Sequence, residues 1–162
     1  MLILFLGAAF LASQAHSSIT PSSVGRMIDY LGAKGTVDKL ANSGPSGAQT
    51  DFGDFDKVLY AIATGDPRWL ALVPRLEPGT DAGTAESLRI VVAKALPKNP
   101  AGVLRLIARK PSWRSACSYP MIEPTRQETR AYFREALPAV KSVRDPALRA
   151  AKRICLSELL KP

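Results

Sequence analysis

Apolar residues recur every three or four positions after residue 50, which is the period of an amphipathic α-helix. No segment alternates apolar and polar residues in the manner of a half-buried strand. The pattern therefore predicts an all-α fold. The apolar stripes are Phe55, Val58, Leu59 and Ile62; Trp69, Leu72, Val73 and Leu76; Leu88, Val91, Val92, Ala95 and Leu96; and Phe133, Ala136, Leu137 and Val140.

Three two-residue motifs mark the expected starts of helices. They place an Asp or Asn directly before a proline, at Asp66-Pro67, Asn99-Pro100 and Asp145-Pro146. The side-chain oxygen accepts a hydrogen bond from a backbone N–H of the first turn, and proline is tolerated there because its missing N–H has no helical partner. Each motif therefore predicts a new helix after a short turn.

The spacing of these motifs indicates a weak internal repeat. They lie 33 and then 46 residues apart, and the extra length corresponds to a non-periodic segment near 110–123. Val58, Val91 and Leu137 each lie eight residues before the capping residue, although Lys141 interrupts the apolar pattern of the third copy. The alignment predicts stacked antiparallel helical hairpins, a short HEAT-like α-solenoid. The alternative is that unrelated hairpins with capped second helices align equally well.

The chain opens with an apolar run over residues 2–12, and no charged side chain precedes Arg26. The run is too short to cross the ~30 Å hydrocarbon layer of a membrane as a helix. It is typical of a signal peptide whose cleavage site ends at Ala15, so we expect a periplasmic or secreted protein without a stable membrane span. An uncleaved N-terminal helix is the alternative, because the first residues contain no Lys or Arg.

Residues between the expected cleavage site and residue 50 are less regular. A helix over 24–31, capped by Ser22 or Ser23, is expected to precede the Gly/Ser/Pro-rich loop at 42–50. The predicted organisation is a signal peptide at 1–15, an N-terminal helix and loop at 16–50, and a helical-hairpin domain at 51–162.

Cys117 and Cys155 are the two cysteines of the chain. In an exported protein they are expected to form a disulfide, which pins the segment at 110–124 onto the last helix. That segment carries Trp113 and Tyr119. It is either a packed cap on the helical array or a binding loop presented to a partner.

The net charge of +8 belongs entirely to the C-terminal part of the chain. Residues 16–99 contain nine Lys/Arg and nine Asp/Glu, whereas residues 100–162 contain thirteen and five. Arginine makes bidentate contacts with carboxylates and phosphates, so an acidic protein or an anionic envelope component is the expected partner. Export makes nucleic acid an unexpected partner. The alternative is an ordinary solvated face. The candidate binding surface consists of Arg126, Arg130, Arg134, Arg149 and Arg153.

Residue types exclude several chemistries. The only histidine, His16, lies at the expected mature N-terminus, and we predict no Ser-His or Cys-His catalytic pair. A histidine-rich zinc site and a copper site at a mature N-terminal histidine each need a second histidine. The segment EPGTDAGTAESL at 77–88 has glycines and an Asp-Ala-Gly but lacks the second Asp loop of an aspartic protease and the strand and lysine of a phosphate cradle. It is interpreted as a turn in which Thr80 or Asp81 caps a helix and glycine permits close packing. We predict no metal, no cofactor and no catalytic residue.

The runs IATGDPRWLALVPRLEPGTDAGTAESL, ALPKNPAGVLRL and CSYPMIEP, with a late cysteine, resemble a group of small exported proteobacterial proteins of unknown function. The resemblance covers roughly residues 52–155 and implies a shared helical fold and export, with no catalytic residues. The expected function is a non-enzymatic binding protein, of inhibitor or immunity type. The alternatives are a structural or assembly factor of the cell envelope and an envelope enzyme using paired carboxylates in a groove. The carboxylate cluster weighed for catalysis is Asp51, Asp54 and Asp56.

Overall fold

A computed structural model describes residues 19–43, 53–118, 120 and 125–161 of the 162-residue chain. Within these residues the secondary structure is helical and contains no strand, which confirms the predicted all-α class. The predicted signal peptide at 1–15, Tyr119 and the proposed domain boundary near residue 50 lie outside the described residues.

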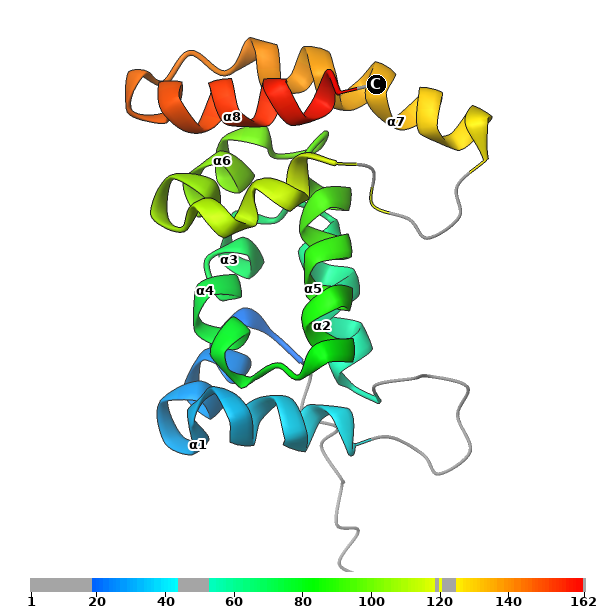
Figure 1. The fold of residues 1–162 in the computed structure, drawn as a ribbon. Coiled ribbons are helices and arrows are strands. Elements are labelled where there is room, and N and C mark those ends of the chain that lie inside the picture. Colours follow the sequence, from blue (N-terminus) through cyan, green and yellow to red (C-terminus); the bar gives the residue numbers. More distant parts are fainter. Residues whose placement is uncertain (1–18, 44–52, 119, 121–124, 162) are drawn as a thin grey trace, which may run out of the picture.

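Figure 1 shows α1 across one end of the molecule and α7 and α8 across the other, with the remaining helices between them. In the middle α2 packs against α5, while the 3₁₀ segment η2 contacts α5, α6 and α8. The elements are α1 (Pro21–Ala41), α2 (Phe55–Ala63), α3 (Pro67–Leu70), α4 (Val73–Leu76), η1 (Glu77–Gly79), α5 (Ala82–Ala95), α6 (Pro100–Arg109), η2 (Pro111–Cys117), α7 (Arg126–Ser142), η3 (Pro146–Leu148) and α8 (Arg149–Leu159).

All three predicted cap–proline motifs start helical segments. The side-chain oxygens of Asp66, Asn99 and Asp145 accept hydrogen bonds from the first-turn backbone N–H groups, at 2.8, 2.9 and 3.0 Å respectively. The segment after Asp145 begins as the 3₁₀ turn η3 and continues as α8. In the turn of EPGTDAGTAESL, Asp81 caps α5 by accepting from the N–H of Thr84 at 2.9 Å. The local hydrogen bonds that begin these helices follow directly from the residue types.

The prediction for the first helix was wrong at its start and cap, whereas its predicted end at Leu31 coincides with a break at Gly32. The helix begins at Pro21 and is capped by Thr20, which accepts from the N–H of Ser23 at 3.1 Å. Thr20-Pro21 is the same cap–proline motif as the three above. α1 also continues to Ala41, although Gly32 at φ +71° breaks it into two arms. Only glycine adopts this backbone conformation without strain, so Gly32 sets the bend.

The apolar stripe from Trp69 to Leu76 is divided between α3 and α4 instead of lying on one helix. Pro74 explains the division, because a continuous helix would need its backbone N–H and would clash with its ring. Trp69 and Leu76 are nevertheless buried, so the stripe faces the core as expected.

A continuous apolar core runs from α1 to α8. Val24 and Leu40 of α1 belong to the same buried cluster as Phe55 of α2 and Cys155 of α8. Gly79 lies against the backbone of α1, where a Cβ would come within 2.3 Å of Ala33. The glycine of the turn therefore permits close packing. No helix within the described ranges is both long and apolar enough to cross a bilayer.

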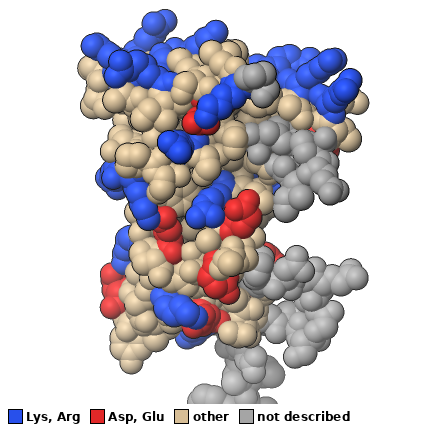
Figure 2. Space-filling view, in the orientation of Figure 1, with Lys and Arg blue, Asp and Glu red and all other residues tan. Residues whose placement is uncertain are grey.

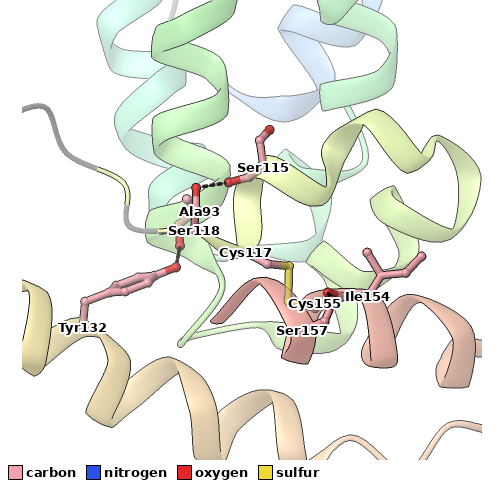
Figure 3. Close-up of a disulfide and its surroundings, with 8 residues drawn as sticks. All are labelled: Ala93, Ser115, Cys117, Ser118, Tyr132, Ile154, Cys155 and Ser157. Atoms are coloured by element: carbon pink, nitrogen blue, oxygen red, sulfur yellow. Dashed lines mark hydrogen bonds between the residues drawn. A yellow bond between two sulfur atoms is a disulfide. The ribbon is translucent and has the colours of Figure 1, made fainter. Parts of the chain in front are cut away.

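Cys117 and Cys155 form the predicted disulfide, and both side chains are fully buried. The bond joins η2 to α8 (Figure 3). Nearby, the Tyr132 hydroxyl of α7 donates to the Ala93 carbonyl of α5 at 3.1 Å. Burial raises the pKa of Tyr132, so the hydroxyl stays protonated and remains a donor. These two contacts attach the α7–α8 end to the core.

Replacing both cysteines by alanine is expected to lower the free energy of unfolding by about 4 kcal/mol, because the disulfide closes a loop between residues 38 positions apart. Urea denaturation of the double variant and of the oxidised protein measures the difference. Equal unfolding midpoints with equal slopes would contradict this role of the disulfide.

The capping carboxylate of Asp81 predicts a loss of stability in acid. Its hydrogen bond from the Thr84 N–H lowers the pKa of Asp81 below the ordinary 3.8, so the stabilisation is present above that value and is lost as the pH falls through the folded pKa. Asp81→Asn keeps a capping oxygen that does not titrate. Urea denaturation at pH values between about 5 and 2 should show that the free energy of unfolding falls less for this variant than for the parent. An equal fall in the two proteins would refute the capping role of the Asp81 carboxylate.

Candidate functional site

Ten basic side chains of the C-terminal part are exposed and form no hydrogen bond or ion pair with other described residues. Nine of them are arginines. Figure 2 shows Lys and Arg gathered over the α7–α8 end, whereas most of the acidic side chains in view lie over the other half. We call this set the basic surface: Arg105, Arg109, Arg114, Arg126, Arg130, Arg134, Lys141, Arg144, Arg149 and Arg153.

In the N-terminal half, most basic side chains have a partner. Of the nine Lys/Arg between residues 16 and 99, five form ion pairs with a neighbouring carboxylate. The longest-range of these joins Arg75 of α4 to Asp29 of α1. A further cation, Lys98, donates to the Ala63 carbonyl at 2.8 Å. The basic surface is therefore a local excess of unpaired charge and not a general property of the chain.

The helical period explains why the members of the basic surface on α6, α7 and α8 are exposed. On α8 the buried side is formed by Ala151, Cys155 and Leu159, which places Arg149 and Arg153 on the opposite side. α6 presents its charged positions in the same way, between the buried residues of its stripe.

Along α7 the arginines are spaced four residues apart, so each is displaced by about 6 Å along the helix and 40° around it. Arg126, Arg130 and Arg134 therefore form a gradually winding row. All five arginines predicted from the sequence are exposed.

The few acidic residues of this part are mostly engaged elsewhere. Glu128 accepts from the N–H and hydroxyl of Thr125, at 2.9 and 2.7 Å, and these bonds lower the pKa of Glu128. Asp145 caps η3, and Glu158 pairs with Lys161 at 2.6 Å. Because these carboxylates have local roles, they leave the arginines uncompensated.

One cation near the basic surface has a structural role. Lys152 donates to the carbonyls of Lys141 and Val143, at 2.6 and 2.8 Å, where α7 ends. A positive charge at this position satisfies terminal carbonyls and suits the negative end of the helix dipole. Lys152 therefore stabilises the turn between α7 and α8.

The segment held by the disulfide packs inward. Trp113 is 4% exposed, and its Nε1 donates to Glu77 Oε2 at 3.2 Å. Lys110 Nζ lies 2.7 Å from the other oxygen of Glu77. This placement is what the packed-cap alternative predicts for Trp113; Tyr119 lies outside the described residues.

Sequence reasoning missed two features of this region. The contacts of Glu77 join residues 33 and 36 positions apart, and no local motif indicates them. Of the other five members of the basic surface, Arg105, Arg109 and Lys141 had a detectable signal, because they alternate with apolar stripes on the helical period, whereas Arg114 and Arg144 lie outside the α-helices.

The carboxylate cluster near α2 is only partly described, because Asp51 lies outside the described residues. Asp54 accepts from the Ser43 hydroxyl at 3.0 Å and pairs with Lys57 at 2.7 Å. The hydrogen bond from Lys57 lowers the pKa of Asp54, which is the opposite of the shift that a general acid needs. Within the described ranges no three metal-ligating side chains come together.

No protein family, curated protein or solved structure matches this chain. The basic surface is therefore interpreted from its own residues.

Glu77→Ala is expected to lower the free energy of unfolding by about 1–3 kcal/mol, because it leaves the buried Trp113 Nε1 without its acceptor. The matched control is Glu86→Ala, which removes an exposed 3.5 Å ion pair with Arg89 and should change stability little. Thermal or urea denaturation compares the two variants. Equal effects would show that Glu77 acts only as a surface charge.

Proposed function

We propose that this protein is an exported, non-enzymatic binding protein whose basic surface holds an acidic protein, in the manner of an inhibitor or immunity protein. The observation that carries the proposal is the group of ten exposed cations without side-chain partners among the described residues. The leader-like sequence at 1–15 and the buried disulfide support export.

The chemistry of the surface favours a carboxylate-rich partner. Nine of the ten cations are arginines, whose planar guanidinium groups bind carboxylates through two parallel hydrogen bonds. Concentrated charge of one sign also attracts an oppositely charged partner from a distance and raises the rate of association. Such a surface would orient the partner before close contact.

The spread of the arginines favours a macromolecule over a small anion. The row from Arg126 to Arg134 extends for about 12 Å at 1.5 Å per residue, and Arg149 and Arg153 lie on the adjacent helix α8. A stable protein interface uses about 800 Å² on each partner, which is an area that such a helical layer can supply.

We further infer that the helices before this layer form two stacked hairpin repeats, α2–α3 and α5–α6. Their turns are tied together by Asn99, which donates to the Gly65 carbonyl, and by Lys98, which donates to the Ala63 carbonyl, both at 2.8 Å. α2 also packs along α5. A stack of this kind would hold the helices that carry the basic surface in a fixed position.

The test reverses the α7 row with Arg126→Glu, Arg130→Glu and Arg134→Glu. Binding of poly-L-glutamate, measured by anisotropy at low salt, should weaken at least tenfold, because three attractions become repulsions. A matched control reverses three exposed cations of the other half, and its affinity should change less than threefold. The control substitutions are Arg26→Glu, Lys39→Glu and Lys94→Glu.

Equal weakening by the two triple variants would show that only net charge matters and would overturn the assignment to the basic surface. Absence of binding by the unmodified protein would overturn it as well. A second arm uses vesicles containing anionic phospholipid. Tight binding to the vesicles with none to poly-L-glutamate would replace the acidic protein by an anionic envelope component.

A further inference from the structure

A cavity of about 540 Å³ lies at the end of the molecule opposite the basic surface. It is lined by both arms of α1, by Ile19 and Ser43 on either side of this helix, and by Asp54, which directly precedes α2. The cavity exists because Gly32, at φ +71°, turns the second arm away from the line of the first. Thr36 donates to the Gly32 carbonyl at 2.8 Å, which satisfies a backbone group at the break. The bend is thus supported by its own hydrogen bond.

The lining of the cavity is largely apolar. Leu40 is 4% exposed, Ile19 and Met27 are partly buried, and Leu31 is 39% exposed. Tyr30 is 89% exposed beside the cavity. A volume of this size with apolar walls is typical of sites for small organic ligands.

Two cations line the same cavity. Arg26 and Lys39 come from different arms of α1, and neither side chain has a hydrogen bond or ion pair within the described part of the chain. The acidic lining residue, Asp54, is already engaged by Lys57 and by the Ser43 hydroxyl. The charge available to a ligand is therefore positive.

We propose that this cavity binds a small amphipathic anion, with its apolar tail among Met27, Leu31 and Leu40 and its carboxylate or phosphate head beside Arg26 and Lys39. An anionic head would give both cations a partner, and the tail would be removed from water on the apolar lining. The apolar residues 2–12 of this chain are a less suitable occupant, because they carry no negative charge. The site is independent of the basic surface and of the function proposed for it.

Isothermal titration of the full chain tests the proposal with three twelve-carbon probes below their micelle concentrations. These are dodecanoate, dodecyl phosphate and uncharged dodecyl maltoside. Dodecanoate or dodecyl phosphate should bind saturably with one site, and the stronger of the two identifies the head group. Dodecyl maltoside should bind at least tenfold more weakly, because it offers no anion to the two cations.

The double variant Arg26→Gln with Lys39→Gln should bind the anionic probe at least tenfold more weakly. Leu31→Asn should bind it severalfold more weakly, because it removes an apolar contact with the tail. The matched control, Arg89→Gln with Lys94→Gln, removes two exposed cations that belong neither to the cavity lining nor to the basic surface, and should leave affinity unchanged. Equal weakening by both double variants, or equal binding of the uncharged probe, would overturn the proposal. Saturable binding of a peptide of residues 1–12 with none of either anion would make the leader the occupant instead.

Discussion

The attachment of η2 to its neighbours is the constraint on which the α7–α8 end depends. Seven residues of 3₁₀ helix bury Trp113, Ala116 and Cys117 between the core helices and the last helix. So short a segment has little stability of its own, because its hydrogen bonds are local and poorly aligned. It is held instead by long-range contacts: the disulfide to Cys155 and the hydrogen bond from Trp113 to Glu77. Those contacts make a linking segment part of the core.

This arrangement separates two kinds of surface along one molecule. In the half built from α1 to α5, carboxylates mostly cap helices or pair with nearby cations, so charge is balanced locally. Beyond η2 the acids are few, and Glu128 and Glu158 make local contacts, while arginines of α6, α7 and α8 occupy positions between the buried stripes. The basic surface is thus the outer side of helices whose inner side is held by the disulfide. The cavity in α1 belongs to the other half and depends on a glycine bend.

The features that sequence analysis predicts well are those that depend on a few neighbouring residues. Asp66, Asn99 and Asp145 cap their helices through bonds that reach two or three positions, and residue type is sufficient to find them. The split at Pro74 and the cap at Thr20 also depend on neighbouring residues, because each involves a proline next to or inside the helical segment.

The remaining features depend on contacts between distant positions, such as Arg75 with Asp29 and Glu77 with Trp113. No local pattern encodes these pairs. The candidate sites differ in the same way. Exposure of the arginines on α6, α7 and α8 is predictable from the helical period, whereas the cavity depends on how the two arms of α1 are placed relative to each other.

The basic surface depends on α8 and η2 forming one rigid unit with the core, and hydrogen–deuterium exchange tests this most directly. Amides of α8 should be protected in the oxidised protein and should exchange at least tenfold faster after reduction of the Cys117–Cys155 bond in mild denaturant, with a larger loss of protection than amides of α2 and α5. Equal protection of α8 in the two forms would contradict the account.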